Sequence, residues 1–214
     1  MKYDVIIVGA GPGGIYSAYE LMKKCSDKKI AVFDSGYSLK KRHCPIDGEK
    51  VKACIKCKSC SIMSGFGGAG AFSDGKYNIT NDFGGTLYEY IGKKAATELM
   101  QYVDDINMAH GGEGTKMYST AGTNLKKVCL QNRLKLLNAS VRHLGTDINL
   151  VVLGRLYDEL KEHVDFYFES PVSHIECLEN GGYRVWSNDK SYDCEKCIVS
   201  VGRSGSKWME HICK

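Results

Sequence analysis

A glycine-rich turn near the N-terminus is the feature that most constrains the fold of this chain. Residues 3–8 form a short β-branched apolar run, which is typical of a parallel strand buried on both faces. Residues 13–24 carry apolar side chains at helical spacing, and Gly9, Gly11 and Gly14 lie at the junction of strand and helix. Three glycines in this context form a dinucleotide-binding fingerprint. The pattern predicts a Rossmann-type strand, turn and helix that binds a pyrophosphate at the helix N-terminus.

Each glycine of the fingerprint has its own role in this prediction. Gly9 permits the tight turn, Gly11 lets backbone amides approach the pyrophosphate, and Gly14 lets helix and strand pack closely. Pro12 and Gly13 complete the loop. The structural alternative is a glycine turn that binds no ligand.

An acidic residue supports the prediction of a bound dinucleotide. Asp34 stands twenty residues after Gly14, at the end of a second apolar run over residues 30–33. A carboxylate there accepts hydrogen bonds from the adenosine ribose hydroxyls and disfavours a 2′-phosphate. The fingerprint and Asp34 do not separate FAD from NAD.

The rest of the chain predicts an α/β fold: a Rossmann-type FAD-binding domain with a parallel sheet, a β-meander, and helical and cysteine-rich insertions. Periodicity fails over residues 35–86, which are first basic and cysteine-rich and then glycine-rich. Residues 87–164 predict mainly helices, over residues 87–106, over residues 124–137 and from Asp147 onward. The last fifty residues predict strands over residues 166–168, 172–178, 183–187 and 198–201, the first three as a β-meander and the last as one more apolar strand. Asn180-Gly181 is the expected hairpin turn. We expect one FAD-binding domain over residues 1–214, because such a meander is associated with FAD domains of the glutathione-reductase type.

A second glycine-rich segment, residues 62–76, reads Ile-Met-Ser-Gly-Phe-Gly-Gly-Ala-Gly-Ala-Phe-Ser-Asp-Gly-Lys. Together with the fingerprint, residues 141–147 and residues 201–205, it resembles a family of uncharacterised FAD-dependent dehydrogenases related to glutathione reductase. The resemblance touches most of the chain. Besides the fingerprint and Asp34, it implies that FAD contacts Gly67, Gly68, Ala69, Gly70, Ser73, Asp74, Gly75, Lys76, Val172 near the adenine, and Gly202. The alternative for residues 67–76 is a glycine-rich surface loop with a solvated lysine.

Two departures from the family pattern bear on function. Cys25 stands where the extended fingerprint often has another glycine, a change that we expect to affect only packing. Members of the family are considerably longer and carry a substrate domain and a final Gly-Asp motif for the flavin. We therefore expect an N-terminal part of such an enzyme, inactive alone, whose flavin site a C-terminal half or a partner chain completes.

Four cysteines gather in the irregular segment. Cys44 is followed by Cys54, Cys57 and Cys60 at Cys-x-x-Cys-x-x-Cys spacing. This spacing suits a zinc site or an iron–sulfur cluster, although the Cys-Pro of the iron–sulfur pattern lies upstream rather than downstream. A redox-active dithiol and reduced thiols in a basic loop remain as alternatives. Cys194 and Cys197 share the spacing but begin an apolar strand, so we expect buried thiols there.

The catalytic residues are unknown from the sequence, and three polar side chains are candidates: Lys76, Arg142 and His143. A histidine beside a flavin is a possible proton donor or acceptor. The alternative is a histidine bonded to backbone, beside Asp147 as a helix cap. Arg42, in the basic run of residues 40–43, is near enough in sequence to be considered for the pyrophosphate.

Composition excludes several classes of protein. The chain has 29 Lys and Arg against 25 Asp and Glu, a formal net charge of +4, which is too small to indicate a nucleic-acid partner. It has no apolar run approaching the roughly 18 residues of a membrane helix. Ten cysteines in 214 residues are fewer than a secreted disulfide scaffold carries, so we expect a cytoplasmic protein with no membrane partner.

The function predicted from these features is that of an FAD-dependent oxidoreductase acting on a small-molecule substrate, with NAD(P)H as a candidate hydride donor. Two alternatives remain. One is a non-catalytic flavin-binding or electron-transfer module whose cysteines hold a metal. The other is an NAD-binding protein without flavin.

Overall fold

The computed structural model describes residues 1–179 and 181–213, and the chain divides into two compact units. The first unit is Met1–Ala71 with Leu156–Lys214, and the second is Phe72–Arg155. The prediction of a hairpin turn at Asn180-Gly181 falls partly on Asn180, which lies outside the described residues.

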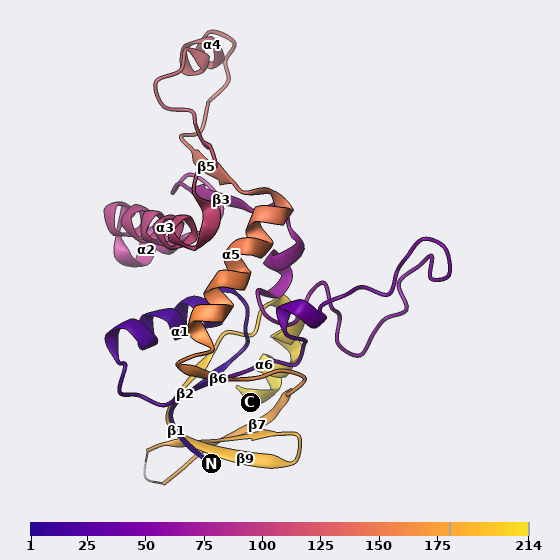
Figure 1. Ribbon diagram of the computed structural model, residues 1–214. Helices are drawn as coiled ribbons and strands as arrows, with labels where there is room; N and C mark the ends of the chain where they lie inside the picture. The colour runs from indigo at the N-terminus through magenta and orange to yellow at the C-terminus, as the bar shows by residue number, and fades with distance from the viewer. Residues whose placement is uncertain (180, 214) are drawn as a thin grey trace. The chain divides into compact units, whose positions relative to one another are not determined.

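The first unit is built on a six-stranded sheet with the strand order β6-β2-β1-β9-β8-β7 (Figure 1). The strands β6, β2, β1 and β9 pair in parallel, and β9, β8 and β7 pair antiparallel as a meander. The bounds are β1 (Lys2–Val8), β2 (Ile30–Phe33), β6 (Val164–Tyr167), β7 (Val172–Cys177), β8 (Tyr183–Ser187) and β9 (Lys190–Val199). The predicted mixture of parallel sheet and meander is therefore confirmed.

Two details of the strand prediction differ from the structure. Residues 166–168 were expected as a strand of the meander, but β6 pairs in parallel with β2 on the other side of the sheet. Residues 198–201 were expected as a separate last strand, but residues 198 and 199 are the end of the ten-residue β9 and residues 200 and 201 lie beyond it. One edge of β9 pairs with β8 and closes the meander, and its other edge pairs with β1. A strand can do both because it has hydrogen-bonding groups on its two edges.

Helix α1 (Pro12–Lys24) follows β1 as predicted, and its apolar stripe of Ile15, Ala18, Tyr19 and Met22 is buried. The core of the first unit lies on the sheet, where Tyr3, Ile6, Phe33 and Val185 belong to one buried cluster. The Phe33 ring stacks on Tyr167 with 4.6 Å between centroids. The remaining elements of this unit are η1 (Leu39–Lys41), η4 (Arg203–Gly205) and α6 (Ser206–Ile212).

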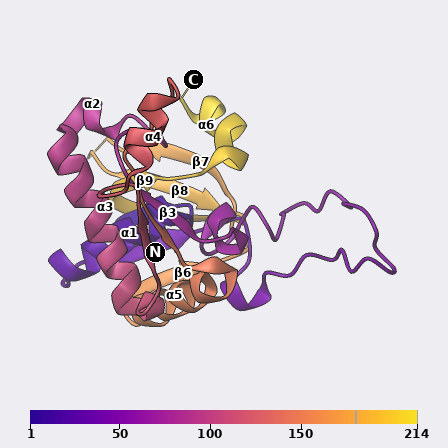
Figure 2. The ribbon, with the colours of Figure 1, turned by 90° about the horizontal axis from the view of Figure 1, so that it is seen from above.

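The long irregular segment of the first unit lies between η1 and η2 (Gly68–Phe72). In both views of the ribbon this segment extends away from the sheet of its unit (Figures 1 and 2). The sequence prediction of a stretch without regular secondary structure is confirmed there.

The second unit combines helices with a small antiparallel sheet of order β3-β5-β4, which the sequence did not predict. The helix expected from residue 87 to residue 106 is broken at Gly92, whose φ of 83° is left-handed. The helix expected over residues 124–137 spans only α4 (Leu125–Gln131). The bounds are β3 (Lys76–Ile79), α2 (Leu87–Ile91), α3 (Lys93–Asn107), η3 (Met108–Gly112), β4 (Met117–Ser119) and β5 (Ser140–His143).

Helix α5 (Gly145–Leu160) begins two residues before Asp147, so Asp147 lies in its first turn and is not its cap. A carboxylate in the first turn still interacts favourably with the helix dipole. Among the described residues, no helix combines the length and the apolar character needed to cross a membrane.

Candidate dinucleotide site

The first unit contains a cavity of about 780 Å³ beside the carboxyl ends of β1 and β2, a size common for ligand sites. Ligands of open parallel sheets bind at this edge, where the strands end. Most of the residues predicted to bind the cofactor line this one cavity: Gly9, Gly11, Pro12, Gly13, Asp34, Gly68, Ala69, Gly70, Val172 and Gly202.

The packing of the protein explains two of the fingerprint glycines. Gly9 has a φ of +105°, and a Cβ there would lie 2.7 Å from the Ser200 carbonyl oxygen. A Cβ on Gly14 would lie 1.8 Å from the carbonyl oxygen of Gly9. Both positions therefore need glycine for the turn and for the close contact of α1 with its strand.

Three other glycines of the cavity wall have no such explanation. Gly11 has an ordinary φ of −76°, and the atom nearest to a Cβ there would be Gly68 Cα at 3.9 Å. A Cβ on Gly70 or Gly202 would meet no atom within 4 Å. These glycines keep side-chain volume out of the cavity, where backbone can lie directly against a ligand.

Helix α1 presents its N-terminus to the cavity. Gly11 is its N-cap and Pro12 its first residue, and no side chain caps the free amides. A thirteen-residue helix carries partial positive charge at this end, which favours an anion. The uncapped amides and the open space at Gly11 fit a pyrophosphate group.

Asp34 connects the end of β2 to the fingerprint loop. Its Oδ2 accepts a hydrogen bond from the amide of Ala10 at 2.7 Å, and its Oδ1 accepts one from Gly36 at 2.7 Å. The residue is half-buried and lines the cavity. Each carboxylate oxygen has a second lone pair, so the acceptor capacity for ribose hydroxyls remains.

The first half of the second glycine motif packs against the fingerprint loop. The Gly67 amide donates to the Ala10 carbonyl at 2.8 Å, and Gly68 approaches Gly11 closely. Phe66 is fully buried and packs edge-to-face on Tyr157, with 5.0 Å between centroids. Gly67 therefore supports the cavity wall, which Gly68, Ala69 and Gly70 form.

Arg42 holds this motif in place and is a site residue to which the sequence analysis gave no definite role. Its side chain is only 5% exposed. Nε donates to the Ser61 carbonyl at 2.8 Å, Nη1 to Phe66 at 2.6 Å and Nη2 to Ile62 at 2.7 Å. Burial lowers the pKa of Arg42, while the charge of Asp34 acts in the opposite direction. The only sequence signal for this role was a basic residue ahead of a glycine-rich segment.

The second half of the motif, residues 73–76, belongs to the second unit. Lys76 Nζ pairs with Asp74 Oδ2 at 2.6 Å, and this hydrogen bond lowers the pKa of the Asp74 carboxyl. A Cβ on Gly75, whose φ is +62°, would lie 2.8 Å from the Gly145 carbonyl oxygen. The assignment of Ser73, Asp74, Gly75 and Lys76 to the cofactor stays a prediction.

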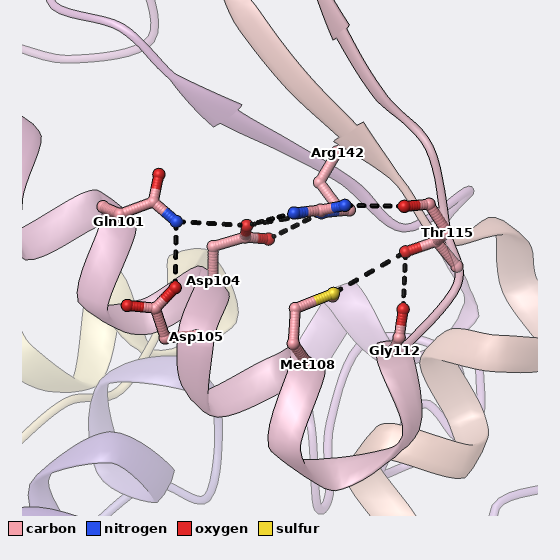
Figure 3. Close-up of polar contacts among 7 residues, drawn as sticks. All are labelled: Gln101, Asp104, Asp105, Met108, Gly112, Thr115 and Arg142. Atoms are coloured by element: carbon pink, nitrogen blue, oxygen red, sulfur yellow. Dashed lines mark hydrogen bonds and ion pairs between the residues drawn. The ribbon is translucent and has the colours of Figure 1, made fainter.

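The candidate catalyst Arg142, itself half-buried, forms an ion pair with the buried Asp104 within the second unit (Figure 3). Its Nη2 lies 2.7 Å from Asp104 Oδ2, its Nη1 donates to the Thr115 carbonyl at 2.6 Å, and Asp104 is 1% exposed. The hydrogen bond with Asp104 raises the pKa of Arg142. His143 is exposed and stands opposite Lys76 in the β3–β5 ladder. The catalytic roles of Lys76, Arg142 and His143 stay predictions.

The metal prediction for Cys44, Cys54, Cys57 and Cys60 finds no support. Within residues 1–179 and 181–213, no three His, Cys, Asp or Glu side chains gather as ligands for an ion. The physical reason is that these cysteines lie along a segment without helix or strand, where no regular element brings all four together. Cys57 and Cys60 instead line the cavity of the first unit.

Cys194 is buried and Cys197 half-buried, so the expectation of buried thiols is confirmed for Cys194. A hydrogen bond between the two thiols lowers the pKa of Cys194 and raises that of Cys197, which burial raises further.

Two buried polar atoms of residues that line the cavity have no hydrogen-bond partner in the part of the chain that the structure describes. They are Ser59 Oγ and Trp208 Nε1. Buried polar groups in proteins almost always have a partner, so each leaves a hydrogen bond for a bound molecule or water to make. The donors and acceptors of the cavity thus fit a polar ligand with apolar faces.

No protein-family model matches the chain. An uncharacterised protein of Clostridium beijerinckii is 23% identical over 214 residues, which are 99% of this chain and 33% of that protein. The chain thus spans about a third of the length of this relative.

Among solved structures, glycine oxidase from Geobacillus kaustophilus superposes with a TM-score of 0.51 at 15% identity, over 97% of this chain and 58% of the oxidase. The chain thus has a Rossmann-type α/β fold, which it shares with this oxidase. Cyclohexanone monooxygenase from Rhodococcus sp. Phi1, bound to NADP⁺, is also similar, with a TM-score of 0.44 at 17% identity over 94% of this chain and 26% of the enzyme.

Proposed function

We propose that this chain is the FAD-binding part of a flavin-dependent oxidoreductase, of the dehydrogenase kind. The observation that carries the proposal is the cavity at the ends of β1 and β2, whose wall glycines leave space that the protein itself does not fill. The fold is compatible with this function, but it is the site that supports the function.

The residues of the cavity divide into groups that suit the parts of FAD. The uncapped amides of α1 and the bare backbone at Gly11 would hold the pyrophosphate. Asp34 would accept hydrogen bonds from the adenosine ribose, and its charge disfavours a 2′-phosphate. Val172, at the start of β7, would contact the adenine, and Gly202 would close the site.

The bound flavin would supply the hydride or electron transfer, and the protein supplies position and shelter. Arg42 fixes the loop of residues 61–66, which leads directly into Gly68–Gly70 of the wall. Phe33, Met63 and Trp208 add apolar surface to the wall and exclude water from it.

Turnover, the substrate and a hydride donor such as NAD(P)H are proposed for the longer protein. The chain spans about a third of the relative from Clostridium beijerinckii, so the remaining contacts of the flavin would come from elsewhere. A catalytic site needs groups on both sides of the reacting ring.

Cofactor binding is tested by titrating the purified chain with FAD, NAD or NADP and following flavin fluorescence and heat of binding. We expect FAD to bind and NADP to be rejected. Tight binding of NAD with no binding of FAD would replace the proposal by that of an NAD-binding protein.

A matched pair of variants tests the position of the pyrophosphate. Gly11→Ala adds a methyl group to the cavity wall, whereas Gly154→Ala adds one inside α5, where a Cβ meets no atom within 4 Å. We expect Gly11→Ala to weaken FAD binding at least tenfold with an unchanged Tm, and Gly154→Ala to leave FAD binding unchanged. Equal affinity of both variants would contradict the assignment.

A further inference from the structure

We propose that Cys57 and Cys60 form a redox-active dithiol that exchanges two electrons with the cofactor of the cavity. The inference rests on the proposed function, because the electrons pass to or from a bound flavin. It gives a role to the cysteine motif, for which the metal interpretation found no support.

The first argument is position. All ten cysteines are free, and Cys57 and Cys60 line the cavity that contains Gly11 and Asp34. Cys54 belongs to the same motif but is not part of the wall, which takes in only residues 57–60 of the basic segment. The pair is thus distinguished from its neighbour by place, although the spacing in the sequence is the same.

The second argument is local geometry. The backbone bends at Lys58 and Ser59, between the two cysteines, and a Cys-x-x-Cys bend is a spacing at which two thiols can join. Cys60 is fixed, because its carbonyl accepts hydrogen bonds from the amides of Met63 at 3.1 Å and Ser64 at 2.8 Å. Cys57 is exposed and lies in a stretch without helix or strand, so its sulfur is free to move toward the sulfur of Cys60.

The third argument is the unsatisfied hydroxyl between the thiols. Ser59 Oγ is buried in the cavity wall without a hydrogen-bond partner among the described residues. A sulfur that becomes a thiolate, or a polar atom of the cofactor, supplies the acceptor that this hydroxyl lacks. Residues 57–60 therefore fit a cavity wall whose thiols are oxidised and reduced beside a bound molecule. They fit a solvated loop less well.

The reaction balances as a two-electron exchange. The thiols of Cys57 and Cys60 lose two protons and two electrons, and one S–S bond forms between the sulfurs. Both electrons and one proton pass to the oxidised flavin, and the second proton passes to solvent. In the opposite direction two electrons and one proton from the reduced cofactor and one proton from solvent would break the S–S bond and form both thiols again.

The dithiol is tested first without flavin. The chain is equilibrated in glutathione buffers of graded potential and its free thiols are alkylated. The masses of the peptides are then measured by mass spectrometry after digestion. We expect Cys57 and Cys60 to lose alkylation together with a loss of two mass units in the peptide that carries both, while Cys54 stays alkylated. Pairing of Cys57 with Cys44 or Cys54, or independent oxidation of the two, would overturn the proposal, as would one zinc or iron per chain in an anaerobic preparation.

The second test counts electrons in the FAD-loaded chain. Anaerobic titration with dithionite, starting from the oxidised protein, should consume four electrons per flavin in the wild type and in Cys54→Ser. Cys57→Ser and Cys60→Ser should each consume two. Consumption of two electrons by the wild type with FAD bound would overturn the dithiol alone. Failure to load FAD would overturn both proposals, and the glutathione experiment would still show whether the disulfide exists.

Discussion

The carboxylate of Asp34 accepts a hydrogen bond from the backbone amide of Ala10 at 2.7 Å. Asp34 follows β2, whereas Ala10 belongs to the fingerprint turn after β1, so the bond joins the ends of two neighbouring strands. The same side chain accepts a second bond from Gly36. An acid that sequence patterns assign to a ribose is therefore also a structural part of the glycine turn.

The double role of Asp34 predicts a double effect of Asp34→Asn. The new amide group turns a donor toward the amide of Ala10 or Gly36, and an unsatisfied buried donor costs about 2 kcal/mol. We expect the free energy of unfolding in urea to fall by about that amount, and FAD affinity to fall at least tenfold. Asp27→Asn, at a side chain that is 80% exposed, is the control and should change neither quantity.

Arg42 is predicted to be required for the stability of the second glycine motif. Arg42→Met removes the donors of three backbone carbonyls, and hydrogen bonds from a charged group contribute about 1.5–3 kcal/mol each. We expect a loss of about 3 kcal/mol in urea unfolding, less than the sum of three bonds because the variant also removes the desolvation cost of a buried charge, together with weaker FAD binding. Arg42→Lys should recover only part of this loss, because one ammonium cannot reproduce the guanidinium fork. The exposed Lys40→Met is the control, and an Arg42→Met variant as stable as this control would refute the role.

The ion pair between Asp104 and Arg142 predicts that the stability of the second unit depends strongly on each of the two residues. Removing one member of a buried pair costs about 3–5 kcal/mol, because the other charge stays buried. We expect Asp104→Ala to cause such a loss, whereas Asp105→Ala, at the exposed neighbouring position, should stay within about 0.5 kcal/mol. In the double variant Asp104→Ala/Arg142→Met the loss should be smaller than the sum of the single losses.

The stability of the meander in acid should depend on the ionisation of Asp193. Arg184 Nε donates to Asp193 Oδ1 at 2.7 Å across β8 and β9, and this hydrogen bond lowers the pKa of Asp193 below the ordinary 3.8. A carboxyl whose folded pKa is depressed contributes stability above its unfolded pKa of about 3.9 and loses it as the pH falls through the folded value. Carboxyl NMR should therefore show that the pKa of Asp193 lies below 3.8, and Arg184→Gln should raise it toward the ordinary value. Titration of Asp193 at its ordinary value in the wild type would contradict the prediction.

Local patterns in the sequence were enough to predict the dinucleotide turn. The strand before Gly9, the helix after Gly14 and the acid at residue 34 lie within one strand–helix–strand unit, where backbone sterics and hydrophobic periodicity act over short distances. The meander was predicted for the same reason. Its exact pairing was not, because whether β9 serves one neighbour or two depends on strands almost two hundred residues apart.

Only the tertiary structure decided which side chains share the cavity. Arg42 and the carbonyl of Phe66 are separated by a segment without periodicity, and nothing local indicates that this guanidinium is buried. Likewise, Cys54, Cys57 and Cys60 are equivalent by spacing, and only the path of the chain places the last two in the wall. The sequence determined the fold and the anion-binding turn because these follow from short-range backbone preferences, whereas the composition of the site depends on long-range packing, which no local pattern encodes.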